Sequence, residues 1–173
     1  MKNKVLSYSY SKEVVPGADS NLAKSEDNDC VVKAFASASG THYEDSHKFV
    51  KKVFKRKNKK GTMFIKSTLE KKQTPEIKIG NKEFKFKILP TSRVTNTYKL
   101  YGEYIEREKT VKSFIKDNQK GTYVVLVSGH AFTVKDGVLI DNPGEEFRPT
   151  RKVQDAIQLI RINDPVGKQL KLF

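Results

Sequence analysis

The chain has 173 residues, of which 36% are hydrophobic, and its net charge is +14. This length and apolar content fit a single domain over residues 1–173. The one cysteine excludes an internal disulfide and favours a reducing compartment, and the lack of a long apolar run excludes a membrane span. Because the chain starts without a signal-peptide pattern, we expect a cytoplasmic protein, located in the host cytoplasm if it is viral.

The first half of the chain predicts helices. After an extended lead over residues 1–16, three helices are expected within a helical part of about 25–75: Cys30 to Gly40, Tyr43 to Lys57 and Met63 to Leu69. Asp29 is a favourable N-cap for the first helix, and Gly40 suits its C-terminal end. Either Thr41 or His42 caps the second.

The second half predicts an antiparallel sheet over about residues 76–165. Alternation about Gly80-Asn81 indicates a hairpin over 77–88, and Asp136-Gly137 indicates another between strands at 121–134 and 138–140. A short helix is expected over 109–117, and a final helix or strand around 153–162. Helices that pack on a later antiparallel sheet are typical of an α+β fold.

The segment between these parts, residues 90–108, has no clear pattern. Tyr98, Tyr101 and Tyr104 recur every three residues, which favours the buried face of a helix. The alternative is that these rings, interleaved with Lys99 and Arg107, stack on unpaired bases.

The chemistry of the chain centres on Cys30. As the first residue of its helix, it lies near unpaired backbone N–H groups and the positive end of the helix dipole, which favour the reactive thiolate. The carboxylates of Asp27 and Asp29 oppose this by repelling negative charge. The alternative is a buried, inert cysteine.

The later hairpin supplies a histidine and a carboxylate. With a two-residue turn at Asp136-Gly137, Phe132 faces Asp141, so His130 and Asp141 are diagonal neighbours on one face, roughly 7–8 Å apart at the backbone. Asn142 then points to the other face. The pattern therefore favours Asp141 as the partner of His130, and a three-residue loop would reverse that choice.

Together these residues resemble those of papain-like cysteine peptidases. Asp29-Cys30 opens a helix, Gly129-His130-Ala131 lies on a later strand, and an Asp-Gly turn leads to Asp141-Asn142. The similarity is greatest to the compact bacteriocin-processing and cell-wall peptidases and to small phage-encoded proteins. Residues 38–45 and 119–130 are also similar to those phage proteins, and the whole resemblance spans about 25–75 and 108–145.

The resemblance implies a papain-like fold with Cys30 as nucleophile, His130 as general base and Asp141 as the group that orients it. Papain-like enzymes usually carry an oxyanion-hole glutamine before the cysteine, whereas no Gln precedes Cys30 here. The substitutes available are Asn28, Ser25 or Asn21, together with the Cys30 N–H. Val31 also replaces the small residue that often follows the cysteine. These departures leave open a fold whose catalysis is lost or altered.

Neither a cofactor nor a metal is expected. No phosphate-binding glycine loop or zinc-finger spacing is present. His42 and His47 are five residues apart, which does not match the pairing of helical zinc motifs, so we expect both at the surface or its boundary.

Charge is concentrated in residues 48–72, which hold eleven basic residues against one acid, whereas residues 17–47 hold six acids and two lysines. The predicted polyanion-binding residues are Lys51, Lys52, Lys55, Arg56, Lys57, Lys59 and Lys60. The alternative is a solvated helix face with an apolar stripe on its inner side.

Three functions remain open. The first is a cysteine-dependent hydrolase of peptide, isopeptide or related amide bonds, with a peptide or protein substrate and a phage origin. The second is a non-catalytic factor that binds nucleic acid or an acidic host protein through residues 48–72. The third is a small inhibitor or host-takeover factor on the same scaffold.

Overall fold

The chain has an α+β architecture in which helices come first and an antiparallel sheet follows, as the sequence predicts. The computed structural model describes residues 9–10, 16–142 and 148–162. The described helices are α1 (Asn21–Ser25), α2 (Cys30–Ser39), α3 (Tyr43–Phe54), α4 (Ile65–Glu70), α5 (Thr91–Val94) and α6 (Val111–Asp117). Of the predicted extended lead over 1–16, most lies outside the described residues.

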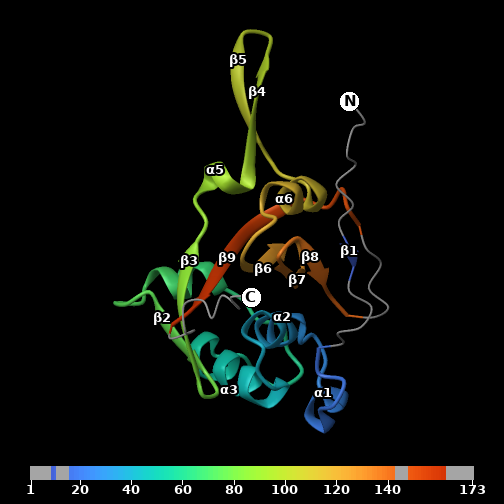
Figure 1. The fold of residues 1–173 in the computed structure, drawn as a ribbon, viewed down its shortest axis with the longest axis vertical. Coiled ribbons are helices and arrows are strands. Elements are labelled where there is room, and N and C mark those ends of the chain that lie inside the picture. Colours follow the sequence, from blue (N-terminus) through green and yellow to red (C-terminus); the bar gives the residue numbers. More distant parts are fainter. Residues whose placement is uncertain (1–8, 11–15, 143–147, 163–173) are drawn as a thin grey trace, which may run out of the picture.

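Within the described residues, the main sheet has seven strands. In chain order they are β1 (Ser9–Tyr10), β2 (Glu76–Ile79), β3 (Lys82–Ile88), β6 (Thr122–Val127), β7 (His130–Lys135), β8 (Val138–Ile140) and β9 (Val153–Arg161). Their spatial order is β1-β8-β7-β6-β9-β3-β2, and only the β1–β8 pair is parallel. The segment expected as a final helix or strand around 153–162 is therefore a strand, β9, and it lies inside the sheet between β6 and β3 (Figure 1).

The helix ends follow local backbone geometry. α2 begins at Cys30 after Asp29 and ends at Gly40, whose φ of 60° is the left-handed conformation that glycine adopts without strain. α3 begins after His42 but stops at Phe54, short of the predicted Lys57, because Lys55 is left-handed. Phe64 is left-handed too, so α4 starts only at Ile65.

Both predicted hairpins form with two-residue turns. Ile79 pairs with Lys82 around Gly80-Asn81. Lys135 pairs with Val138 around Asp136-Gly137, where both turn residues have positive φ. The register expected between β7 and β8 is therefore confirmed.

Helices cover both faces of the sheet (Figure 1). On β6, Val124 belongs to the core under α2 and α3 with Phe35, whereas Val125 belongs to a second core with Phe114 of α6. The Thr133 hydroxyl donates to the Ala34 carbonyl at 2.7 Å, which fixes α2 against β7. That hydrogen bond holds the helix that begins at Cys30 against the strand that begins at His130.

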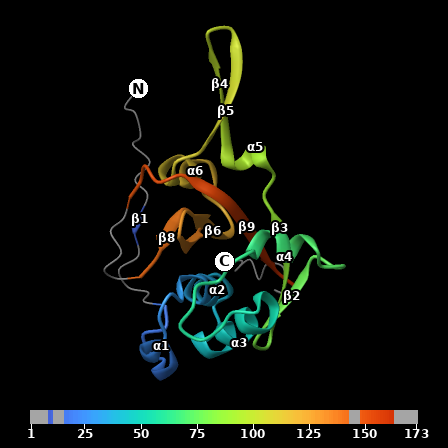
Figure 2. The ribbon, with the colours of Figure 1, turned by 180° about the vertical axis from the view of Figure 1, so that it is seen from behind.

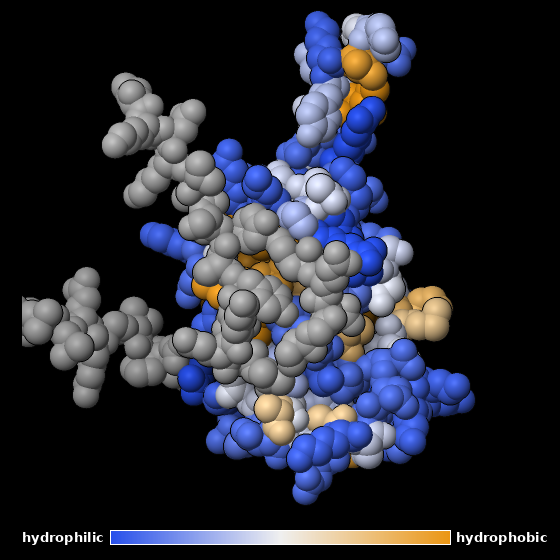
Figure 3. Space-filling view, turned by 90° about the vertical axis from the view of Figure 1, so that its right-hand side faces the viewer, coloured by the Kyte–Doolittle hydropathy of each residue, from blue (hydrophilic) through white to orange (hydrophobic). Residues whose placement is uncertain are grey.

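Residues 95–108 form a separate hairpin of β4 (Thr95–Leu100) and β5 (Glu103–Glu108), which projects from the body of the molecule (Figures 1 and 2). Tyr98, Tyr101 and Tyr104 are 50%, 96% and 76% exposed, so the prediction that they face the core was wrong. This two-stranded sheet is separate from the main sheet, and apolar side chains such as Leu100, which is 42% exposed, stay at its surface (Figure 3).

In the described part of the chain, no helix combines the length and the apolar character needed to cross a membrane.

Candidate active site

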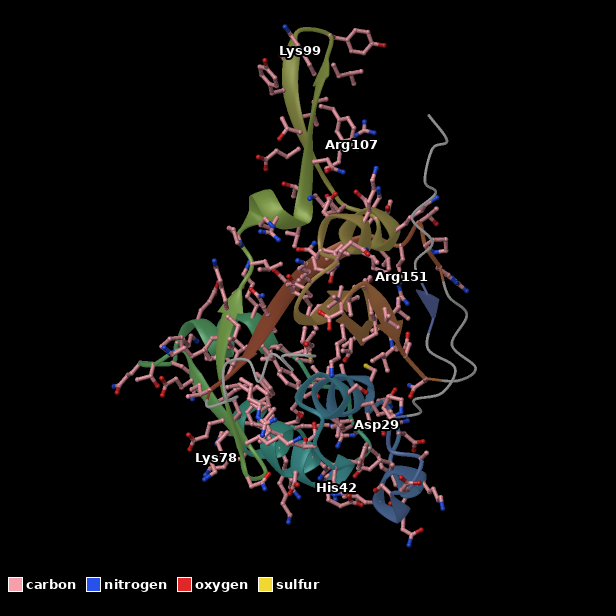
Figure 4. All side chains as sticks on the ribbon, viewed as in Figure 1. Asp29, His42, Lys78, Lys99, Arg107 and Arg151 are labelled. Carbon is pink, nitrogen blue, oxygen red and sulfur yellow. The ribbon has the colours of Figure 1, made fainter. Side chains whose placement is uncertain are left out.

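Cys30 is the first residue of α2 and is partly exposed. Asp29, labelled in Figure 4, precedes it as N-cap, but its side chain makes no capping hydrogen bond. Instead it accepts from the Tyr43 hydroxyl at 2.7 Å and pairs with Lys33 at 3.2 Å. The charge of Asp29 is thus compensated by partners of its own, and the first N–H groups of α2 are left uncapped by this side chain.

His130 and Asp141 form a partly buried pair. The Nε2 of His130 donates to the two carboxylate oxygens of Asp141 at 2.9 and 2.8 Å, and the two side chains are only 8% and 13% exposed. The backbone N–H of Asn142 also donates to Asp141, at 2.7 Å. The preference for Asp141 over Asn142 as the histidine's partner, which followed from strand parity, is confirmed.

Electrostatics favour the charged form of this histidine. Burial lowers the pKa of His130, but hydrogen bonds with Asp141 and Cys30, and the charges of both groups, outweigh it and raise the pKa to about 10. His130 is therefore an imidazolium at neutral pH, hydrogen-bonded to the carboxylate of Asp141 and interacting with the thiol group of Cys30. Since Asp141 holds Nε2, Nδ1 is the ring nitrogen left to exchange a proton with the thiol.

Cys30 and His130 line one cleft of about 620 Å³. Its walls are the start of α2, the segment 61–70 with α4, the β6–β7 turn and the start of β9. Met63 and Phe64 line this cleft although they are 66% and 73% exposed, so part of its wall is apolar. Such a cleft can hold an extended apolar or mixed chain beside the thiol.

The three candidate oxyanion donors separate in space. Only Asn28 lines the cleft, and its Nδ2 donates to the Lys59 carbonyl at 3.2 Å. Ser25 donates to the Leu22 carbonyl within α1, and neither it nor Asn21 lines the cleft. Gln154 of β9 does line it, although the sequence gives no local signal for this because strand β9 reaches the site only through the sheet.

Most of the predicted polyanion-binding residues lie at the surface. Six exposed lysines form a basic surface at the end of α3 and in the loop after it: Lys51, Lys52, Lys55, Lys57, Lys59 and Lys60. Arg56 does not belong with them, and its inclusion was wrong, because its side chain is 1% exposed and its Nη2 donates to Glu26 at 2.8 Å. Burial of a guanidinium requires such a partner.

Arg56 belongs to a buried cluster with Glu26 and His47. The Nε2 of His47 lies 3.2 Å from Glu26, and the Lys59 backbone N–H donates to Glu26 at 2.8 Å. Burial raises the pKa of Glu26, but hydrogen bonds from Arg56 and Lys59 and the charge of Arg56 lower it to about 2. The expectation that His47 lies at the surface was therefore wrong, whereas His42 is exposed.

Among the described residues, no group of three or more His, Cys, Asp and Glu side chains is arranged to hold a metal ion. Comparison of the chain with protein-family models, curated proteins and solved structures finds no match.

Proposed function

We propose that the protein is a cysteine-dependent hydrolase of amide bonds, built on a papain-like arrangement. One observation carries the proposal: His130 is hydrogen-bonded to Asp141, interacts with Cys30, and lines the same cleft as Cys30. A nucleophile, a base and an orienting group in contact are the components of thiol acyl transfer. The position of Cys30 at the start of a helix adds stabilisation of negative charge on sulfur.

The chemistry follows from these contacts. The Cys30 sulfur, its proton held by His130, attacks the carbonyl carbon of a peptide or isopeptide bond and forms a tetrahedral oxyanion. The C–N bond then breaks, His130 gives its proton to the leaving amine, and a thioester remains on Cys30. His130 next takes a proton from water, and the hydroxide attacks the thioester. The C–S bond then breaks, which releases the carboxylic acid and restores the Cys30–His130 pair.

Asp141 has an orienting role in this scheme. By accepting from Nε2, it fixes the tautomer and ring position of His130 and stabilises the imidazolium. The apolar side chains of Met63 and Phe64 at the cleft favour a substrate with apolar residues next to the scissile bond.

The first test is the rate at which iodoacetamide alkylates Cys30 at pH 6, which reports on one site because the chain has a single cysteine. Thiolate held by imidazolium reacts at this pH, whereas an ordinary thiol is almost fully protonated. We expect His130→Ala to slow alkylation roughly tenfold, since the loss of thiolate exceeds the gain in nucleophilicity. Asp141→Asn should slow it less.

The matched control is His42→Ala, which removes an exposed histidine and should leave the rate unchanged. Equal rates in the wild type and in His130→Ala, or no reaction of the folded wild type, would rule out the Cys–His pair as the basis of function.

A second candidate function is supported by the basic surface defined above. Six lysines within ten residues, all exposed, attract polyphosphate without base specificity. A non-catalytic binder of nucleic acid or of an acidic host protein would need this surface and not Cys30. The two functions are compatible in one chain, because no lysine of the basic surface lines the cleft.

A further inference from the structure

A thiol hydrolase needs hydrogen-bond donors for the oxyanion of its tetrahedral intermediate. The backbone N–H of Cys30, at the start of α2, is one donor. The side-chain amide of Asn28 is directed to the Lys59 carbonyl at 3.2 Å, and Asn28 itself is in the left-handed conformation that this turn imposes. That bond uses one of the two amide N–H groups of Asn28 and fixes the direction of the amide, so a side-chain donor without such a bond is better suited to the oxyanion.

Strand β9 has an irregularity where it borders the cleft. Leu126 of β6 pairs with Asp155, but the next residue, Val127, pairs with Val153, so Gln154 is an extra residue in β9. This is a β-bulge, in which two residues of one strand oppose one of its partner. Bulges redirect side chains and are frequent beside active sites.

The bulge changes which side chains face the cleft. Val153 and Ala156 both belong to the core beneath α6, although strict alternation over three residues would place them on opposite faces. The residues between them point the other way: Asp155 pairs with Lys66 of α4 at 3.0 Å, and Gln154 lines the cleft with Cys30 and His130. Gln154 is exposed, and the described part of the chain gives its amide no hydrogen-bond partner.

We infer that Gln154 is the side-chain oxyanion donor of this site. Its Nε2–H donates to the oxyanion that forms when the Cys30 sulfur adds to a carbonyl, while the Cys30 N–H donates from the other side. The amide makes and breaks only hydrogen bonds in this step. This assignment rests on the proposed hydrolase function. It places the side-chain donor on β9, which is remote in sequence from Cys30, and not in the segment before the cysteine.

Two reagents separate this role from thiol reactivity in general. Iodoacetamide reacts by displacement of iodide and forms no oxyanion. p-Nitrophenyl acetate reacts at its carbonyl through an oxyanion, leaving acetyl on the sulfur and releasing p-nitrophenolate. We expect Gln154→Ala to slow acetylation about a hundredfold and to leave alkylation within twofold of the wild type. Gln154→Glu, which replaces the donor by an acceptor of similar size, should slow acetylation at least as much.

Gln158→Ala is the matched control, because Gln158 lies on the same strand and does not line the cleft. It should leave both rates unchanged. An unchanged alkylation rate in Gln154→Ala also shows that the fold and the Cys30–His130 pair are intact.

The outcomes distinguish this inference from the proposal on which it rests. Equal acetylation rates in the wild type and in Gln154→Ala would overturn the role of Gln154 but would not contradict the proposed hydrolase function. A parallel loss of both rates in Gln154→Ala would overturn it too, because it would indicate a structural role. A wild type that is alkylated but never acetylated would remove the hydrolase and this inference together.

Discussion

At the scale of single residues, His130 is stabilised in its charged form by two neighbours. Its pKa is about 10 in the folded protein against an ordinary value of 6.5, because Asp141 and Cys30 outweigh the effect of burial. A group that binds its proton more tightly when folded stabilises the folded state while it is protonated. The contribution of His130 is therefore fully present below pH 6.5 and is lost as the pH rises through about 10.

This predicts a pH-dependent cost of removing the imidazole. The free energy of unfolding in urea should be lower in His130→Gln than in the wild type at pH 6, and the difference should narrow steadily towards pH 10, because the wild type loses the charged pair over that range. His42→Gln, at an exposed position, should show no such trend. A difference that stays constant or widens with pH would contradict the raised pKa.

At the scale of elements, the buried cluster of Glu26, His47 and Arg56 ties the segment before α2 to the end of α3. Arg56 also donates to the Asp27 carbonyl at 3.0 Å, and Glu26 accepts from the backbone of Lys59. These hydrogen bonds fix the turn that leads into Cys30 and the loop that carries part of the basic surface. With its pKa lowered to about 2, Glu26 stabilises the fold above pH 4.5, and that contribution is lost as the pH falls through about 2.

Arg56→Met should therefore destabilise the protein strongly. It leaves the carboxylate of Glu26 buried without its main partner, and breaking a buried ion pair in this way costs about 3–5 kcal/mol. The measurement is urea unfolding at pH 7 followed by circular dichroism. Lys57→Met, one residue on and exposed, is the control and should change the free energy of unfolding by less than about 0.5 kcal/mol. Similar effects of the two substitutions would show that the cluster does not hold these two segments together.

At the scale of the whole molecule, the net charge of +14 is unevenly distributed. Part of the opposite charge of the two segments is neutralised within the fold, where Glu26 of the acidic segment pairs with Arg56 of the basic one. The lysines of the basic surface carry positive charge in solution instead. Any polyanion that binds this surface must release counterions, so its affinity falls as salt rises.

The corresponding test replaces the six lysines of the basic surface by serine, which lowers the net charge from +14 to +8 by subtraction of six. We expect elution from heparin at clearly lower salt. The affinity for single-stranded DNA should also depend less steeply on salt, with a logarithmic slope reduced by about 0.7 for each phosphate that the variant no longer neutralises. Alkylation of Cys30 should not change.

The control for this test replaces six exposed lysines elsewhere by serine: Lys78, Lys85, Lys87, Lys112, Lys116 and Lys120. It has the same net charge as the first variant but keeps the basic surface. Equal losses of affinity in both variants would mean that net charge, and not this surface, governs binding.

The sequence by itself determined the features that depend on neighbours along the chain. Asp29 and Gly40 mark the limits of α2: Asp29 precedes the first helical residue, and Gly40 ends the helix because left-handed geometry is a local property. The Asp136-Gly137 turn sets the register of β7 and β8, and strand parity then brings His130 to Asp141. The papain-like relationship, which rests on the same local patterns, stays a prediction.

Only the tertiary structure decided what depends on distant segments. In the sequence, Arg56 is one of a run of basic residues and is expected at the surface. It is buried because the fold brings Glu26, thirty positions away, beside it. Tyr98, Tyr101 and Tyr104 of the β4–β5 hairpin repeat every three residues, yet all three are exposed. Gln154 lines the same cleft as Cys30 because β9 inserts between β6 and β3 with one extra residue. Burial and long-range strand pairing depend on which surfaces meet once the chain has folded. The periodicity of a single segment does not tell which distant segment packs against it.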